Sequence, residues 1–288
     1  MKTIAERILL MSLIGQTLAV SGCYNWAKCL RKTMAECRVE KSVNAGFASG
    51  SKLVVRDNDG AINVRAGDEM DCHVTATAFI HAPTKREAAE IGEQLEIVAE
   101  RDAGRLLIAV RKPSMPQEHR FVSVDLDIVV PRAAHVDCET TFGRVRLAGL
   151  TGDVKASTQF GSITCEDIRG SLDLETQLGR ITCREIAAEH IVASSQKGSI
   201  DISCADACPA ELVADVSTEW GKIRFQAPAQ YQGALDLESE MGSVKLDKDA
   251  DVGGAVENSF LHDRVSGRIG SGAGNLRLFS NLGSVALR

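Results

Sequence analysis

The sequence predicts an all-β protein, a β-solenoid with coils of about 18–25 residues and one short helix in an insertion near the N-terminus. Three observations lead to this fold class. The stretch TQFGSITC, residues 158–165, returns as TQLGRITC at residues 176–183. Glycines recur at spacings of 18, 18, 19, 23 and 21 residues, and apolar and polar residues alternate on both sides of them. These glycines are Gly143, Gly161, Gly179, Gly198, Gly221 and Gly242.

The first 22 residues are expected to form a signal peptide. Lys2 and Arg7 precede an apolar run at 8–20 that is too short to span a bilayer comfortably. The run ends in AVSGC, which resembles the bacterial lipobox and would make Cys23 the lipidated first residue of the mature chain. Several acyl chains give stable anchoring. We therefore expect a lipid-anchored protein on a membrane of the cell envelope, outside the cytoplasm. An ordinary signal peptide or an uncleaved anchor is the alternative.

Residues 23–50 show no clear period and are expected to be a linker, or tether, with a short helix as the alternative. Cys29 and Cys37 lie within it and are candidates for a disulfide with each other.

The segment from 51 to 288 is expected to form the β-solenoid. Ile163 and Cys165, two and four residues after Gly161, illustrate apolar positions that recur after every glycine. Period two places such positions on one face of a strand. A second alternating strand precedes each glycine, and glycine suits the corner because it tolerates a positive φ or a crowded backbone. The same template occurs at residues 53–64 and 276–287.

An insertion at about 66–131 interrupts the coils. Strands are expected at 72–80, 105–110 and 121–130. Between them, Thr84 and Glu87 match a capping box that opens an amphipathic helix over 84–100.

Residues 51–288 resemble the bacterial putative-adhesin domain of unknown function. The resemblance rests on the opening pattern [LV]-x-V-x-(N/D)-x-x-G-x-[IV]-x-V at 53–64, the helix-containing insertion, and the following coils with G-x-[IV] corners. It implies a cell-envelope protein of the kind often called an adhesin, and it implies no catalytic residue.

Composition excludes some classes of function. A net charge of −6 and a pI near 5.6 argue against a nucleic-acid partner, which selects for basic surfaces. The histidines show no metal-ligand spacing, and the chain has no catalytic triad or phosphate-binding loop. We therefore expect no metal, no cofactor and no enzymatic activity.

The cysteines divide into two groups. Cys138, Cys165 and Cys183 occupy inward positions and are expected to be core residues. Cys204 and Cys208 lie where the 23-residue spacing holds its extra length, in a loop expected to be exposed. A local disulfide between them is the favoured interpretation, two free thiols are the alternative, and a metal site with Asp206 is the least favoured because only two soft ligands are in view.

Two outward-facing stripes are the candidate functional surfaces. A basic stripe follows the glycines and comprises Arg144, Arg146, Arg180, Lys222, Arg224 and Lys245. An acidic stripe precedes them and comprises Asp137, Glu139, Asp173, Glu175, Asp215, Asp236 and Glu238, with Lys155 among them. Stacked cations are suited to an anionic glycan, a lipid headgroup or an envelope protein. Charge pairing between coils on a solvated face is the simpler alternative.

These features favour a non-catalytic lipoprotein that offers a binding, adhesion or scaffolding surface. One alternative is a polysaccharide lyase or hydrolase that uses the acidic stripe, because neighbouring coils would place carboxylates about 5–10 Å apart. Another is an envelope-stress sensor or regulatory partner.

Overall fold

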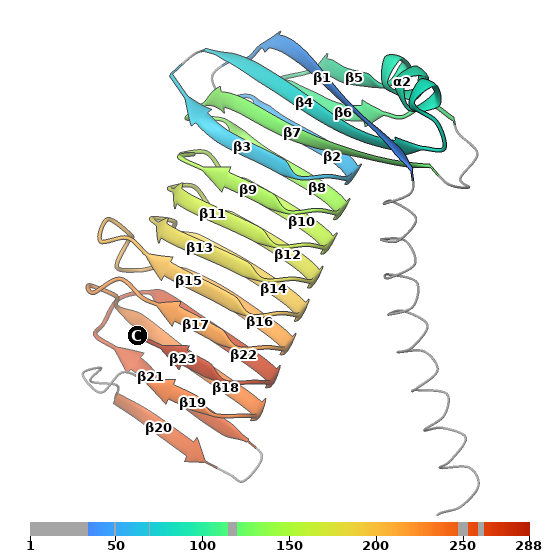
Figure 1. Ribbon diagram of the computed structural model, residues 1–288. Coiled ribbons are helices and arrows are strands. Elements are labelled where there is room, and N and C mark those ends of the chain that lie inside the picture. Colours follow the sequence, from blue (N-terminus) through green and yellow to red (C-terminus); the bar gives the residue numbers. More distant parts are fainter. Residues whose placement is uncertain (1–33, 49, 69, 115–119, 247–252, 259–261) are drawn as a thin grey trace, which may run out of the picture. The chain divides into compact units, whose positions relative to one another are not determined.

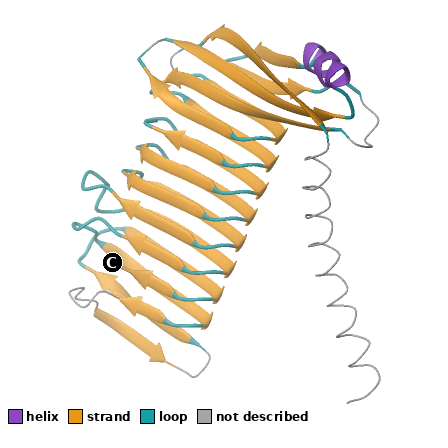
Figure 2. Cartoon of the chain, in the orientation of Figure 1, coloured by secondary structure: helices purple, strands orange, loops and turns teal. Residues whose placement is uncertain are grey.

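The computed structural model describes residues 34–48, 50–68, 70–114, 120–246, 253–258 and 262–288 (Figure 1). The predicted all-β class is confirmed, since the described residues form two large, mostly parallel sheets and one helix, α2 (Lys85–Gln94; purple in Figure 2). The chain divides into two compact units. Within the described residues, one unit comprises 34–39, Ala78–Leu95 and the described part of 112–122, and the other comprises the described residues of 40–77, Glu96–Arg111 and 123–288. The candidate sites lie in the second unit.

The two sheets contain every strand of the described chain. The 11-stranded sheet has the order β1 (Ala35–Gly46), β4 (Asp71–Ala82), β7 (Phe121–Pro131), β3 (Ile62–Gly67), β9 (Val145–Ala148), β11 (Ile163–Ile168), β13 (Ile181–Ile186), β15 (Ile200–Cys204), β17 (Ile223–Gln226), β23 (Val285–Leu287) and β19 (Val244–Leu246). The 12-stranded sheet has the order β20 (Gly253–Asn258), β21 (Asp263–Ile269), β18 (Gly233–Met241), β22 (Gly274–Leu282), β16 (Val213–Trp220), β14 (His190–Lys197), β12 (Leu172–Leu178), β10 (Val154–Phe160), β8 (His135–Phe142), β2 (Lys52–Asp59), β6 (Arg105–Arg111) and β5 (Glu96–Asp102).

From β8 to β17 the chain contributes strands alternately to the two sheets, and neighbouring strands in each sheet are parallel and in register. Thr158 lies beside Thr176, and Cys165 beside Cys183. The two copies of the octapeptide therefore stack residue on residue. The apolar positions on both sides of the glycines are buried, and Ile163 and Ile181 are completely so. Burial of each such aliphatic side chain stabilises the fold by about 1.5–3 kcal/mol before chain entropy is subtracted.

The glycine corners are explained by a close approach of neighbouring backbones. A Cβ atom added to Gly161 would overlap the carbonyl oxygen of Gly143, and one added to Gly179 would overlap that of Gly161. Neither of these glycines has a positive φ, so crowding is the reason for glycine here. At Gly283 a Cβ atom would likewise overlap the carbonyl oxygen of Gly221, and a φ of 155° adds a second reason for glycine there.

A buried hydroxyl completes most corners, the exception being Thr140 before Gly143, which makes no such bond among the described residues. Thr176 Oγ1 donates a hydrogen bond of 3.1 Å to the carbonyl oxygen of Gly161, and Thr158 makes the same bond to Gly143. Ser195, Thr218, Ser280 and Ser239 repeat the contact in other corners. The threonine of the octapeptide therefore satisfies a carbonyl group of the neighbouring coil, a role that the alternation pattern does not indicate.

Two predictions near the N-terminus are wrong in part. The expected tether at 23–50 contains strand β1, in which half-buried and exposed residues alternate along all 12 positions. The helix begins as predicted, with Thr84 Oγ1 accepting a hydrogen bond from the Glu87 amide, but it ends at Gln94 and not near residue 100. The segment EIVAERD that follows forms β5, where its β-branched residues pair with β6.

The coil order at the C-terminal end differs from the order in the sequence. Strands β22 and β23, which come last in the chain, lie between the coil of Gly221 and the coil of Gly242. Beyond β18 the 12-stranded sheet continues with β21 and then β20. Both of these pairings are antiparallel, so the sheet is mixed at this end. Sequential stacking, which the spacing of the glycines suggested, holds only as far as β17.

Candidate functional site

The predicted basic stripe lies on the outward side of the 11-stranded sheet. Arg144, Arg180 and Lys222 each follow a corner glycine, but they alternate with serines along the stack and so lie on every second strand. Two strand spacings correspond to about 10 Å. Because β23 lies between β17 and β19, Lys245 is also two strands from Arg224 instead of one. The six cations therefore lie on one face. They are further apart along the stack than they would be if every coil carried a cation at the same position.

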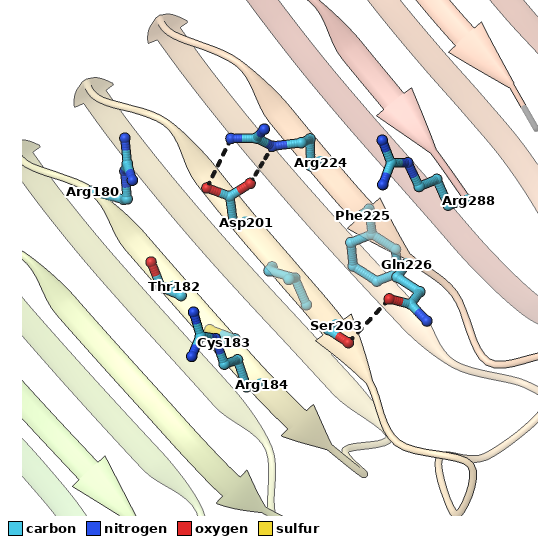
Figure 3. A pocket seen from close by; sticks show the side chains of 11 residues that line it. Arg180, Thr182, Cys183, Arg184, Asp201, Ser203, Arg224, Phe225, Gln226 and Arg288 are labelled. Carbon is cyan, nitrogen blue, oxygen red and sulfur yellow. Dashed lines mark hydrogen bonds and ion pairs between the residues drawn. The ribbon is translucent and has the colours of Figure 1, made fainter.

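This face is hollowed between β13, β15 and β17. The hollow has a volume of about 370 Å³, and the arginines Arg180, Arg184, Arg224 and Arg288 line it together with one carboxylate side chain, Asp201 (Figure 3). Its remaining lining residues are Thr182, Cys183, Ile202, Ser203, Phe225 and Gln226. We call the predicted six cations together with Arg184 and Arg288 the basic face.

Arg184 and Arg288 were not among the predicted cations. The alternation considered only the four positions after each glycine. Arg184 lies five residues after Gly179, just beyond them, and Arg288 follows the last strand. Extending each coil by one outward position would have found both of them.

Most cations of the basic face have no ion pair. Arg224 pairs with Asp201 on the neighbouring strand, with 2.5 Å between Nε and Oδ1. Within the described residues the other seven cations make no ion pair or side-chain hydrogen bond. Guanidinium groups bind carboxylate, sulfate and phosphate groups in a bidentate manner, so the hollow is suited to an anionic ligand.

The acidic stripe, on the outward side of the 12-stranded sheet, is mostly neutralised. Lys155 pairs with Asp173 at 2.5 Å and Arg264 with Asp236 at 2.9 Å. Asp137, Glu139 and Asp215 also have lysine or arginine partners, and Glu238 lies 3.4 Å from His262, an ion pair only when the histidine is protonated. Glu175 is the one member with no ion pair among the described residues. Charge pairing between strands, the simpler of the two interpretations, describes this face well.

Asp137 is the most enclosed member of the acidic stripe. Burial disfavours its ionised form, but hydrogen bonds from Lys52 and Arg56 outweigh that effect and hold the pKa of the carboxyl below its ordinary value. Lys52 Nζ lies 2.7 Å from one carboxylate oxygen and Arg56 Nη1 lies 2.9 Å from the other. An aspartate held ionised in this way acts as a structural anchor for β2 and β8.

Apolar side chains line the edge where the corners turn. The residues before the glycines are exposed, with 53% of Phe142 and 56% of Trp220 accessible. Phe142 and Phe160 stack with ring centroids 4.9 Å apart, and the Lys197 ammonium lies over the Trp220 ring. Phe160, Leu178 and Met241 complete the exposed set. The sequence placed apolar residues here, and the structure shows that they face solvent at the edge of the basic face.

Cys204 and Cys208 are both buried, contrary to the exposed loop that we expected. Both are thiols in the structure. The Cys208 thiol donates a hydrogen bond to the carbonyl oxygen of Ala188 at 3.4 Å. A hydrogen bond between the two cysteines, together with burial, raises the pKa of Cys204. The two side chains are therefore adjacent, and a disulfide between them remains a prediction. Cys138, Cys165 and Cys183 are core residues, as predicted.

The predicted signal peptide, Cys23 and Cys29 lie outside the described residues. Across the described ranges, no helix has the length and apolar character needed to cross a membrane.

Comparisons with known proteins give similarities of fold only. No family model and no curated protein matches the chain. A protein described as a putative adhesin from Bacteroides fragilis is 14% identical, with a TM-score of 0.46 over 87% of this chain and 97% of its own. One with the same description from Parabacteroides distasonis is 10% identical, with a TM-score of 0.43 over 88% and 97%. A putative cell adhesion protein from Clostridium sporogenes is 10% identical, with a TM-score of 0.40 over 88% and 99%.

Proposed function

We propose that this chain is a non-catalytic cell-envelope lipoprotein whose stacked coils form a solenoid that binds an anionic polysaccharide along the basic face. The observation that carries the proposal is the hollow in which four arginines surround a single carboxylate side chain. Because the whole protein has a net charge of −6, its composition does not explain this local surplus of cations.

The spacing of the cations favours a polysaccharide over a more densely charged polymer. Arg144, Arg180 and Lys222 lie about 10 Å apart along the stack. Two sugar residues of an extended chain cover a similar distance, so a polymer with one acidic group per disaccharide would match the cations. Many weak contacts of this kind give useful affinity without a deep pocket. The exposed rings of Phe160 and Trp220 at the adjoining edge add apolar contact area.

The contacts of the acidic stripe favour binding over catalysis. Five of its seven carboxylates have lysine or arginine partners, and the hydrogen bonds of Asp137 stabilise its ionised form. A glycosidase needs one carboxyl group with a raised pKa to protonate the leaving group. The proposal therefore assigns no catalytic role to this stripe.

Binding to hyaluronan, which carries one carboxylate per disaccharide, tests the proposal. The Arg144→Ser, Arg180→Ser, Lys222→Ser triple variant should bind hyaluronan at least about tenfold more weakly, and wild-type binding should weaken steeply with salt. The matched control is the Arg105→Ser, Lys155→Ser, Arg277→Ser triple variant, which removes the same charge from exposed positions on the 12-stranded sheet. Equal loss in both triple variants, or binding that is insensitive to salt, would eliminate the basic face as the site. New reducing or unsaturated ends in the polymer would indicate an enzyme.

The lipid anchor has a separate test. Cys23→Ala should abolish incorporation of radiolabelled palmitate and either release the protein from membranes or leave the precursor uncleaved, because no other residue can receive the diacylglyceryl group. Cys29→Ala is the control and should keep the label. Label that persists in Cys23→Ala refutes lipidation at this position.

A further inference from the structure

A second hollow lies on the outward side of the 12-stranded sheet, away from the basic face. It has a volume of about 520 Å³ and extends across β12, β14, β16 and β22. Its lining residues are Glu175, Thr176, Gln177, Ser194, Ser195, Gln196, Ser217, Thr218, Glu219 and Phe279.

The hollow arises from one column of outward residues. Glu175, Ser194, Ser217 and Phe279 are register partners on four successive strands. Two small serines between larger residues leave a depression that spans three strand spacings, about 14 Å. Thr176, Ser195 and Thr218 also line it, and their buried hydroxyls donate hydrogen bonds to corner glycines, which hold these strands in place beneath the hollow. The depression is therefore built on a rigid part of the sheet.

The walls offer groups that bind sugar hydroxyls. The amides of Gln177 and Gln196 and the hydroxyls of Ser194 and Ser217 are both donors and acceptors, while Glu175 and Glu219 are acceptors. Among the residues that the structure describes, none of these six makes a side-chain hydrogen bond or ion pair. The half-buried ring of Phe279 closes one end and offers an apolar surface to the carbon face of a pyranose ring.

We propose that this hollow binds a short stretch of an uncharged polysaccharide, as a site separate from the basic face. No lysine or arginine lines it, and its two carboxylates disfavour an anionic ligand. Its polar walls, with one ring, are too hydrophilic for an acyl chain. The inference does not depend on the proposed function, because the two surfaces belong to different sheets and select ligands of different charge.

Three neutral hexasaccharides test the site: cellohexaose, mannohexaose and chitohexaose. Each is titrated into the full chain, kept soluble in a detergent without a sugar headgroup, and binding is measured by calorimetry in low and high salt. We expect at least one to bind with an affinity that does not change with salt, unlike hyaluronan on the basic face. The Ser194→Gln, Ser217→Gln double variant fills the hollow and should abolish this binding. Phe279→Ala should weaken it about tenfold.

The chain offers a matched control in the same column. Ser157 is the register partner of Glu175 on the other side and lies outside the hollow, so Ser157→Gln should leave the affinity unchanged. Urea midpoints equal to that of the wild type show that each variant is folded, since all these side chains point outward. Three results would overturn the inference: none of the three sugars binds, binding survives in the double variant, or Ser157→Gln weakens it equally. Loss of hyaluronan binding in the double variant would also overturn it, whereas the basic-face triple variant should bind the neutral sugar normally.

Discussion

At the residue scale, the corner glycines are the positions where the sequence has least freedom. Each one lies so close to the carbonyl group of a neighbouring corner that no other residue fits. The hydroxyl three residues earlier, as in Thr176, then donates to that carbonyl group and prevents it from being buried without a partner. Glycine and threonine recur together because both serve the same contact between coils.

Gly161→Ala should lower the free energy of unfolding by about 2–4 kcal/mol, because the added methyl group must push two backbones apart. Gly253→Ala is the control, since a Cβ atom there meets nothing within 4 Å, and it should change stability by less than about 0.5 kcal/mol. Urea denaturation measures both. Equal midpoints for the two variants would contradict the crowding explanation.

Asp137 should make stability depend on pH in the acidic range. Its pKa is lower in the folded protein than the ordinary value of about 3.9, so its stabilising contribution is fully present above pH ~4 and is lost as the pH falls through the folded pKa. Asp137→Asn should therefore cost about 1 kcal/mol at pH 7 and much less at the acidic end. The measurement is urea unfolding at pH 7 and at pH 3. Asp102→Asn, at an exposed position whose side chain makes no hydrogen bond or ion pair among the described residues, should show no such difference.

At the element scale, alternation along each strand decides which face is buried. Ile181 is completely buried between Ile163 and Ile200, while Arg180 beside it is exposed. Strand β1 shows that the same signal was present near the N-terminus and was overlooked. Five of its six half-buried positions carry apolar side chains, with Lys41 as the exception, and every intervening position is polar or glycine.

Ile181→Asp should reduce the free energy of unfolding by several kcal/mol, because it places an unpaired charge in the core. Arg180→Ser should have little effect on stability, since the side chain it removes is exposed and has no partner among the described residues. Urea midpoints compare the two. Similar losses would show that the inward column is assigned wrongly.

At the scale of the whole molecule, the unexpected feature is the order of the last coils. Strand β22 pairs in parallel with β16 on one side and with β18 on the other. Its apolar residues Leu276 and Leu278 match the inward columns of both neighbours, so either order would bury the same kinds of side chain. Hydrophobic pattern alone therefore cannot choose between them.

Thiol cross-linking distinguishes the two orders. Asp215 and Asp236 are both register partners of Arg277 and lie on opposite sides of it. Dibromobimane, which fluoresces when it bridges two nearby thiols, should react with the Asp215→Cys, Arg277→Cys pair and not with the Asp215→Cys, Asp236→Cys pair, whose strands are about 10 Å apart. The reverse result would mean that the coils stack in sequence order.

The sequence by itself determined the all-β class, the corner glycines, the inward columns and the start of helix α2, because each depends on local geometry with a period of two or on a single cap. It also identified six cations of the basic face, since outward positions alternate with inward ones. Tertiary structure alone decided which coils are neighbours, and therefore the real spacing of Lys245 and the contribution of Arg288. It also decided which charges are paired, as with Arg224 and Asp201, and where two serines leave a hollow beside Phe279. Those outcomes depend on contacts between strands far apart in the sequence, such as the one between Ser280 and Gly221, which are 59 residues apart, and no local pattern records them.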